Sequence, residues 1–403
     1  MSNVHIVIVH KVKEIYYSIA IKRVYDALRA SKIQGIEVYI IDQGWFEQHT
    51  DDGWNLEVLV KGTRSTIEKI IEKLANIEGY RISELFDELQ GVTTGSNEFF
   101  VFDINKLVEL EEKYKLSESE LLYDCISGKD VKPWSITIRK KILFPYKINA
   151  DKKTGEQSWI PVFMTEKGDV LDFVKVFVQD EKSDEDIHER LNKRIAYGII
   201  PLKLIGVAKY LVDNYDKLKR RTYEQKSIEE YAGVWYGFHR PRSPNIIKTP
   251  NIVTPRIVKK PRFALNENKV IPLDSIIVLV PKENEDGKLN ELRQELKNIL
   301  GSSISLKDLL LYIVAILNSK ISYIILKTRA TRIRGGYYTI DEKYLSSIIV
   351  PKPRIEDKDI LSKIFDCLRH SRWNEASELA TSLYLKHAKL SKEDIELLLS
   401  ANR

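Results

Sequence analysis

The sequence has few cysteines and no long hydrophobic run. Only two of its 403 residues are cysteine, Cys125 and Cys367, and they lie far apart, in no spacing typical of metal ligands. This usage argues against a disulfide scaffold and fits a reducing compartment. No apolar stretch approaches the ~18 residues that a membrane span needs, and the apolar run at the N-terminus is too short for a signal peptide. We therefore expect a cytoplasmic protein without a membrane span.

Methionine is also scarce, while Lys, Glu and Ile are abundant, a bias that occurs in thermophile proteins. The chain has 64 basic and 58 acidic side chains, which gives a formal net charge of +6. This balance is only mildly basic. Any inference about a polyanionic partner therefore depends on where the basic residues cluster, not on their total.

The apolar patterns predict a mixed α+β fold. Strands are expected at 4–9, 36–42, 55–62, 99–102 and 142–146, and hairpins or strand pairs at 159–177, turning at 167–169, and at 261–282, turning at 266–268. Helices are expected at 14–31, 63–75, 104–124, 199–221, 306–328, 356–381 and 389–400, with a short helix near 82–90. The charged ends of 306–328 and its Asn318-Ser319 interruption favour a buried helix over a membrane span.

The segment 240–262 interrupts this mixed composition. It reads RPRSPNIIKTPNIVTPRIVKKPR, with seven Lys or Arg, five Pro, and no Asp or Glu. Because proline blocks helices and ladder pairing, the sequence predicts a loop or an edge strand here. Ion pairing with acids from elsewhere in the chain is one interpretation. We favour contact with a polyanion through the basic side chains Arg240, Arg242, Arg256, Lys259, Lys260 and Arg262.

Aromatic residues lie directly before this segment. Trp235 and Phe238 fit a hydrophobic core, although rings at this place could also stack on a displaced base. His239 has no second ligand or nucleophile nearby in the sequence, so we expect it to contact DNA and not to act in catalysis.

A second basic cluster without acids lies at 327–338. The helix dipole explains cations at the end of the preceding helix, but not Arg332 and Arg334, which lie beyond it. A glycine pair at 335–336 would let the backbone approach a partner closely. We expect DNA contacts from Arg329, Arg332, Arg334, Tyr337 and Tyr338.

Two weaker candidates lie nearer the N-terminus. The turn at 93–97 is polar and contains glycine, so Thr94, Ser96 and Asn97 could hold a phosphate or a base edge, or simply form the entry to a strand. The triplet Arg139, Lys140 and Lys141 is either a solvated charged face or a DNA contact.

Four sequence phrases occur in a fixed order between residues 82 and 355. They are GVTTGSNEFFVF, then SGKDVKPW with ILFPY, then WYGFHRPR leading to RFALNENKVIPLDSIIVLVP, then AILNSKISYIILKTRATRIRGGYYTIDEKYLSSIIVPKP. Together they resemble the target-recognition region of adenine-N6 DNA methyltransferases of type II and type IIG restriction–modification systems, the TaqI-like C-terminal specificity domain. The last phrase is also similar to half of a type I specificity subunit.

The resemblance implies a target-recognition domain at 81–355, with a mixed, small barrel-like sheet and packed helices. An N-terminal α/β segment at 1–80 would be a methyltransferase remnant or a docking piece, and 356–403 a helical tail. In that family a catalytic domain precedes this region, with a glycine-rich S-adenosylmethionine loop and an Asn/Asp-Pro-Pro-Tyr/Phe motif. The chain has neither motif. We therefore expect no catalytic or metal-binding residue and no bound cofactor here, and S-adenosylmethionine, with or without Mg²⁺, on a catalytic methyltransferase or endonuclease subunit.

The resemblance thus predicts recognition of double-stranded DNA for a catalytic partner. Two alternatives stay open. The chain could be a degenerate or self-sufficient methyltransferase or restriction enzyme with an unrecognised active site, or a non-catalytic interaction protein that reuses the fold. A nuclease centre would need clustered carboxylates for Mg²⁺, and the acids near Asp169 and Asp274 are better explained by turns.

Overall fold

The computed structural model describes residues 70–396, apart from 71, 152–154, 164–186, 197–199, 283, 285 and 395. Residues 75–389 form one compact unit. The strands and helices expected between residues 4 and 62, and the hairpin turn expected at 167–169, lie outside the described residues.

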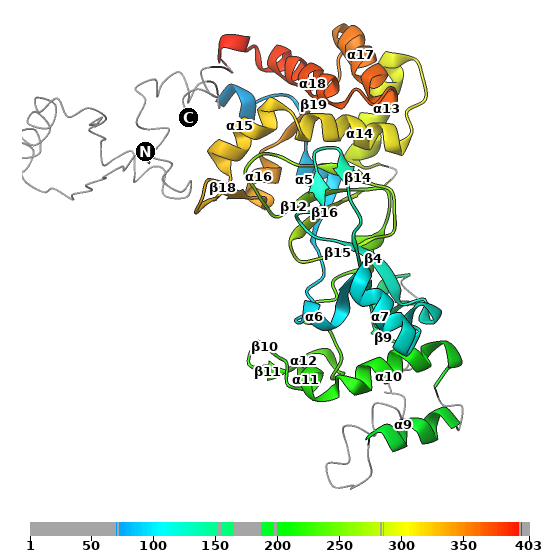
Figure 1. Ribbon diagram of the computed structural model, residues 1–403. Coiled ribbons are helices and arrows are strands. Elements are labelled where there is room, and N and C mark those ends of the chain that lie inside the picture. Colours follow the sequence, from blue (N-terminus) through cyan, green and yellow to red (C-terminus); the bar gives the residue numbers. More distant parts are fainter. Residues whose placement is uncertain are drawn as a thin grey trace, which may run out of the picture. The chain divides into compact units, whose positions relative to one another are not determined.

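The predicted α+β class is confirmed, with several small sheets and a helical C-terminal region (Figure 1). One antiparallel sheet has the order β14(Ala264–Asn266)-β12(Asn251–Pro255)-β16(Ile276–Pro281)-β2(Phe86–Gln90). A mixed sheet has the order β15(Ile271–Pro272)-β4(Leu122–Ile126)-β7(Lys140–Leu143)-β3(Val101–Asp103). A three-stranded sheet has the order β13(Ile257–Val258)-β18(Tyr337–Thr339)-β17(Arg332–Ile333). The two-stranded sheets pair β1(Gly79–Arg81) with β19(Ile349–Pro351), β5(Val131–Lys132) with β6(Ser135–Ile136), β8(Tyr146–Ala150) with β9(Gln157–Pro161), and β10(Thr222–Tyr223) with β11(Lys226–Ser227).

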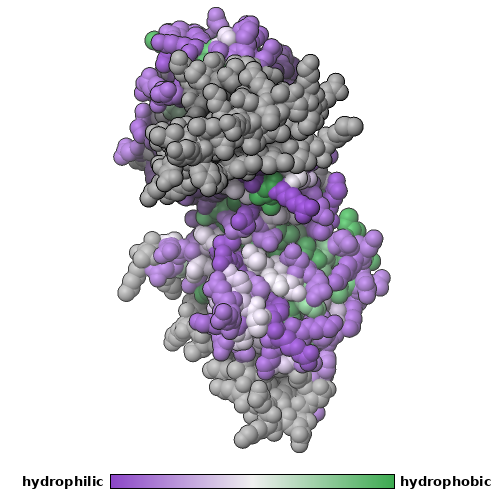
Figure 2. Space-filling view, turned by 90° about the vertical axis from the view of Figure 1, so that its left-hand side faces the viewer, coloured by the Kyte–Doolittle hydropathy of each residue, from purple (hydrophilic) through white to green (hydrophobic). Residues whose placement is uncertain are grey.

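Helices α14, α17 and α18 pack against one another at the C-terminal end of this unit. The α-helices are α5(Ile82–Leu85), α6(Asn97–Phe100), α7(Ile104–Tyr114), α9(Ile187–Ala196), α10(Ile205–Asp213), α11(Tyr215–Lys219), α12(Ile228–Ala232), α13(Lys288–Leu300), α14(Leu306–Leu317), α15(Lys320–Arg329), α16(Glu342–Ser346), α17(Lys358–Arg369) and α18(Trp373–Ala388). The short 3₁₀ helices are η2(Leu116–Ser119), η3(Leu202–Leu204), η4(Pro244–Ile247) and η5(Ile355–Asp357). Figure 2 shows that hydrophilic side chains cover much of the described surface on one side, with a smaller hydrophobic area between them.

The proline-rich segment is only in part the loop or edge strand that its sequence predicts: β13 is an edge strand, whereas β12 is not. Strand β12 pairs with β14 on one side and β16 on the other, and all five of its residues are buried. The prolines do not interrupt the strand because Pro250 precedes it and Pro255 ends it. Four residues of the same segment form the short helix η4, with Pro244 in its first turn.

The strands at 264–266 and 271–272 do not form the expected hairpin. Strand β14 pairs with β12, whereas β15 pairs in parallel with β4 of the other four-stranded sheet. The turn between them, in which the Asn268 N–H donates to Asn266 Oδ1 at 3.2 Å, therefore carries the chain from one sheet to the other.

The apolar stretch 306–328 is two helices and not one. Helices α14 and α15 meet at Asn318 and Ser319 with a bend of 58°. Ser319 caps α15 by accepting from the Ser322 N–H, and most apolar side chains of α14 are buried. Among the described residues no single helix is long and apolar enough to cross a membrane, and only this bent pair meets that test by length and composition.

Other local predictions needed correction where tertiary pairing decides the conformation. The helix expected near 82–90 is one turn, α5, followed by strand β2, because 86–90 pairs with β16. The strand expected at 99–102 begins only at Val101, and the helix expected over 104–124 ends at Tyr114. The tail breaks at 370–372 and not near 381–389, where the left-handed Ser371 (φ 55°) separates α17 from α18.

Candidate nucleic-acid interface

The two basic clusters of the sequence meet in the three-stranded sheet. Ile257 and Val258 of β13 pair with Thr339 and Tyr338 of β18, and β18 pairs in turn with β17 at Arg332–Ile333. A further backbone bond joins the Ile340 N–H to the Arg256 carbonyl at 2.7 Å. We call the sheet with its flanking residues Arg256, Lys259, Lys260 and Arg334 the basic sheet.

The lysines of the basic sheet lie over tyrosine rings. Lys259 Nζ lies 4.7 Å from the centre of the Tyr337 ring, and Lys260 Nζ lies 5.8 Å from that of Tyr323. Lys327 from α15 also faces the Tyr323 ring, at 4.9 Å. Such contacts orient an ammonium group and leave its charge undiminished, since a ring carries no net charge. Lys259 and Lys260 are exposed, so the sheet presents positive charge to solvent.

The two tyrosines of β18 differ in exposure. Tyr337 is 38% exposed and Ile257 is 46% exposed, whereas Tyr338 is only 8% exposed. Adjacent residues of a strand point to opposite faces, so Tyr337 belongs to the outer face and Tyr338 to the inner one. Of the two predicted contacts, Tyr337 is placed to meet a ligand, and the Tyr338 side chain contributes to packing.

The glycine pair forms the turn of this sheet. Gly335 and Gly336 have φ angles of +84° and +73° and connect β17 to β18. A left-handed pair of this kind favours glycine for conformational reasons alone.

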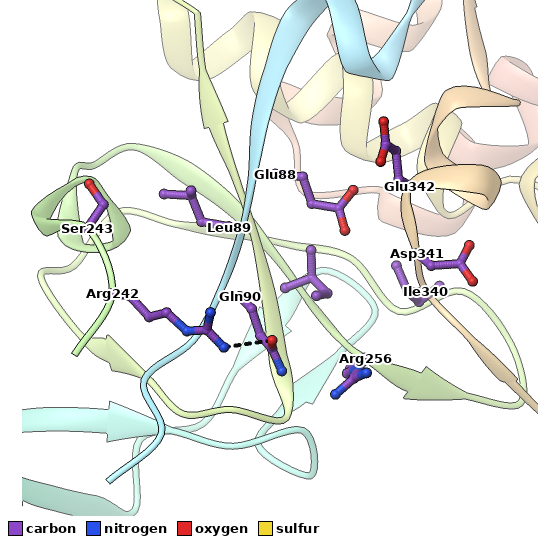
Figure 3. A pocket seen from close by; sticks show the side chains of 10 residues that line it. Glu88, Leu89, Gln90, Arg242, Ser243, Arg256, Ile340, Asp341 and Glu342 are labelled. Carbon is purple, nitrogen blue, oxygen red and sulfur yellow. Dashed lines mark hydrogen bonds between the residues drawn. The ribbon is translucent and has the colours of Figure 1, made fainter. Parts of the chain in front are cut away.

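A cavity of about 410 Å³ lies beside the basic sheet. Figure 3 shows its lining from β2, β16, the loop at 242–243 and the start of α16. Arg242 donates from Nη2 to Gln90 Oε1 at 2.7 Å and from Nε to the Gly91 carbonyl at 3.2 Å. Arg256 lies across the cavity, near Asp341. Burial, followed by the charges on Arg240 and Arg256, lowers the pKa of Arg242, partly offset by nearby tyrosines.

Three carboxyl groups, which sequence reasoning missed, also line this cavity: Glu88, Asp341 and Glu342. Burial, and then the negative charges of Glu342 and Asp341, raise the pKa of Glu88 to about 7. Asp341 caps α16 by accepting from the Tyr344 N–H at 3.0 Å. The sequence can indicate the capping role of Asp341, because Asp is common before a helix, but it does not indicate that this residue lines a cavity. Glu88 belongs to a strand that was predicted as a helix, so nothing marked it as a cavity residue.

The turn at 93–97 packs against the start of the basic segment. Thr93 forms a β-bridge with Arg240, and a Cβ at Gly95 would lie 2.3 Å from His239 Nε2. Thr94 is 1% exposed, and its hydroxyl donates to Asn97 Oδ1 at 2.7 Å and accepts from the Ser96 N–H. The Thr94 side chain is therefore an internal part of the turn, while Asn97 is exposed on α6.

Arg221, the last residue of the helix expected at 199–221, connects this turn to the aromatic segment through hydrogen bonds. Its guanidinium donates to the carbonyls of Thr94 (3.1 Å), Trp235 (3.1 Å), Gly237 (2.9 Å) and Leu218 (2.9 Å). Burial lowers the pKa of Arg221 to about 10. No sequence signal distinguishes a basic side chain that bonds carbonyls from one that faces solvent.

The core interpretation of the neighbouring aromatic residues is confirmed. Trp235 and Phe238 are fully buried, as is Tyr236. His239 packs on the Tyr223 ring, with centroids 4.6 Å apart, and burial followed by the charge of Arg221 lowers its pKa. Arg240 forms an exposed ion pair with Glu224 at 3.2 Å, which is the pairing with distant acids that the sequence left open.

The remaining predicted contacts do not all lie on the basic sheet. Lys140 and Lys141 are part of β7 in the mixed sheet, next to Arg139, and Lys141 pairs across the strands with Asp124 at 2.8 Å. Arg329 is the last residue of α15, where the helix dipole favours a cation. Arg262 lies next to Phe263, whose N–H and carbonyl both bond the side-chain amide of Asn318 at 2.9 Å.

No group of three or more His, Cys, Asp or Glu in the described part of the chain is arranged to hold a metal ion.

No family model matches the chain, and no curated protein matches it. Among solved structures, it is similar to the Type IIL restriction–modification enzyme MmeI in complex with DNA, with 11% identity and a TM-score of 0.38, over 81% of this chain and 32% of that one. It is also similar to the type IIG restriction endonuclease BpuSI, with 15% identity and a TM-score of 0.36, over 91% of this chain and 38% of that one. The chain spans about a third of the length of each of these two structures.

Proposed function

We propose that this chain recognises double-stranded DNA for an adenine-N6 restriction–modification system and positions the DNA for a catalytic partner. The basic sheet is the observation that carries the proposal. It joins two acid-free basic segments, separated by some seventy residues of sequence, into one surface. Lys and Arg clusters of this kind contact phosphates and set the register of a protein on the duplex.

The cavity beside the basic sheet supplies the side chains that can distinguish bases. Arginine and glutamine bond the edges of guanine and adenine in the major groove, and a carboxylate accepts from the amino group of cytosine. Arg256 and Glu88 offer two of these chemistries at one place, whereas the Gln90 amide bonds Arg242 and the Asp274 carbonyl within the protein. The cavity therefore complements the phosphate contacts of the basic sheet with base reading.

The chemistry is assigned to another polypeptide. The sequence has no glycine-rich S-adenosylmethionine loop and no Asn-Pro-Pro-Tyr motif. In this proposal S-adenosylmethionine, and Mg²⁺ where the partner also cleaves DNA, bind a cytoplasmic methyltransferase or endonuclease subunit.

Electrophoretic shifts with duplex DNA across a range of salt concentrations test this assignment. The double variant Lys259→Gln/Lys260→Gln is expected to bind more weakly. It should reduce the slope of log affinity against log salt by about 2, since each lost phosphate contact removes about 0.9. The matched control is Lys358→Gln/Lys363→Gln, which removes the same charge from exposed positions of α17.

Equal slopes for both double variants would contradict the basic sheet as the DNA surface. Absence of any salt-sensitive binding by the wild type would favour an interaction protein. Sequence recognition is checked by enrichment from a pool of random duplexes, where we expect one adenine-containing site to emerge.

A further inference from the structure

A second cavity, of about 410 Å³, lies on the other side of Arg242 from the one described above. Arg242 lines both. The second is lined by the rings of Tyr146, Trp159, Tyr231, Phe238 and His239, with Arg240 and Arg242 also in the lining. We call it the aromatic cavity. Its size falls within the range of ligand pockets, roughly 300–1,000 Å³, which are also mostly apolar with a few polar groups.

The rings are held by their neighbours. Tyr146 and Phe238 lie 5.2 Å apart between centroids, and the Phe238 N–H donates to Tyr146 Oη at 2.6 Å. Trp159 packs edge-on against Phe144 at 4.7 Å. Tyr231 is 39% exposed, whereas Tyr146 and Phe238 are buried and Trp159 is half-buried, and the Tyr231 ring lies 4.7 Å from that of Tyr223. The cavity therefore has fixed aromatic walls and one accessible ring.

Two buried nitrogen atoms of the lining residues lack partners. Trp159 Nε1 and His239 Nε2 are both inaccessible to solvent, and neither meets a hydrogen-bond partner among the described residues. An unpaired buried N–H costs about 1–3 kcal/mol, so such atoms commonly mark a place where a ligand or water completes the structure. His239 Nε2 lies against the backbone at Gly95, so the indole N–H of Trp159 is the donor that remains for a ligand.

The arginines supply positive charge next to these rings. The contacts of Arg240 and Arg242 described above use one and two of their N–H groups, and a guanidinium has five. A flat aromatic surface, one indole N–H and neighbouring guanidinium groups together fit a planar nitrogen heterocycle that carries a phosphate.

We propose that the aromatic cavity binds one unstacked base of a nucleic acid strand, with the adjoining phosphate at Arg240 and Arg242. This inference rests on the proposed function and deepens it, because it adds a single-base site to a duplex-reading surface. The same chemistry would accept a base displaced from a duplex, a base of a single strand or a free mononucleotide.

The test compares three probes on the full chain. They are a single-stranded decamer with one central 2-aminopurine, the duplex of the same sequence, and adenosine monophosphate. The emission of 2-aminopurine reports whether that base leaves its stacked environment, and quenching of tryptophan emission reports mononucleotide binding. Wild type is expected to change the 2-aminopurine emission of the decamer and to bind it in competition with adenosine monophosphate.

Tyr231→Ala removes the accessible ring, and about tenfold weaker binding of the decamer is expected, because stacking contributes ~1–3 kcal/mol per base. Trp159→Phe keeps a ring but removes the indole N–H and should also weaken binding. Both variants are expected to keep duplex binding in electrophoretic shifts within twofold. Leu202→Ala is the control, since it removes an exposed apolar side chain that belongs neither to the cavity nor to the basic sheet. Thermal melts establish that each variant is folded.

The outcomes separate this inference from the proposed function. One outcome is that the wild type binds duplex DNA but Tyr231→Ala changes neither its affinity for the decamer nor that for adenosine monophosphate. This result overturns the proposed base site and leaves the proposed function intact. A second outcome is that adenosine monophosphate binds, that Tyr231→Ala weakens this binding, and that the wild type shows no salt-sensitive binding of duplex DNA. This result supports the proposed base site and overturns the proposed function. If 2-aminopurine emission changes in the duplex as well as in the decamer, the cavity also takes a base that has been displaced from a duplex.

Discussion

At the scale of single residues, Glu88 brings a titratable charge to the proposed DNA surface. Burial and the neighbouring Asp341 and Glu342 raise its pKa to about 7, so the carboxyl is protonated below that pH and becomes negative as the pH rises through it. The charge faces Arg242 and Arg256 across the same cavity. A negative charge at this place repels a polyanion.

We therefore expect the affinity of wild type for duplexes of random sequence, in which few sites place a cytosine at this carboxylate, to fall between pH 6 and pH 8. Glu88→Gln cannot ionise, so it should reduce this loss of affinity by about 1.4- to fivefold, which corresponds to ~0.2–1 kcal/mol for a partly exposed charge pair. Binding measured by fluorescence anisotropy at constant ionic strength gives the comparison. Asp87→Asn is the control, because Asp87 is the adjacent residue of β2 and points to its other face. An unchanged pH profile for Glu88→Gln would show that this carboxyl lies away from the bound DNA.

Arg221 illustrates a different residue-scale effect, on stability. Its guanidinium donates hydrogen bonds to backbone carbonyls of three separate segments, at 94, 218 and 235–237. Replacing it by methionine leaves partly buried carbonyls without their donor, and we expect a loss of about 2–4 kcal/mol in the free energy of unfolding. Arg220→Met removes the same charge at the exposed neighbouring position and should change stability little. Urea unfolding of both variants measures the difference, and equal midpoints would contradict the role given to Arg221.

At the scale of elements, the bend between α14 and α15 places Asn318 against the basic segment. Its amide bonds both backbone groups of Phe263, and Lys259 and Lys260 lie just before that residue. Asn318→Leu should therefore lower stability by about 2 kcal/mol and also weaken duplex binding, because the segment loses its anchor. Thr328→Val on α15 serves as the control, since the Thr328 hydroxyl bonds only carbonyls of its own helix, at Ile324 and Ile325. Calorimetry and anisotropy measured on the same samples would separate the two effects, and unchanged binding would limit Asn318 to a structural role.

The elements also show what the sequence could predict. Composition and periodicity correctly indicated an α+β fold, a buried apolar stretch at 306–328 and buried aromatic residues at 235–238. They did not predict that β12 is an interior strand. Its pairing with β14 and β16 is a tertiary contact, and no pattern within residues 251–255 indicates it. The expected strand pair at 261–282, turning at 266–268, was wrong for the same reason, since a turn signal does not say whether its flanking strands pair with each other.

For the candidate site, the sequence indicated both basic clusters, but it did not indicate that they contribute strands to the same sheet. Charge clusters are visible in a sequence, whereas the pairing of β13 with β18 is not. The residues that sequence reasoning missed are those whose role comes from tertiary neighbours: Glu88, Gln90, Arg221, Asn318, Asp341 and Glu342.

At the scale of the whole molecule, the proposal divides recognition and chemistry between two polypeptides. We expect the isolated chain not to bind S-adenosylmethionine, and binding to appear when a catalytic subunit encoded by the neighbouring open reading frame is added. Isothermal titration of S-adenosylmethionine into each preparation, and into the partner alone, checks this. Tight binding by the isolated chain would favour the self-sufficient enzyme over the recognition subunit.

The sheet of β13, β18 and β17 has a bearing on how such a protein can be re-engineered or can diverge. Its strands come from 257–258 and from 332–339, and each supplies the backbone partner of the other. If only the proline-rich segment were exchanged between two relatives, the chimera would contain β13 of one parent and its pairing strand β18 of the other. Successful chimeras, and recombination events that survive selection, should therefore carry both segments from the same parent, with crossover points outside 240–340.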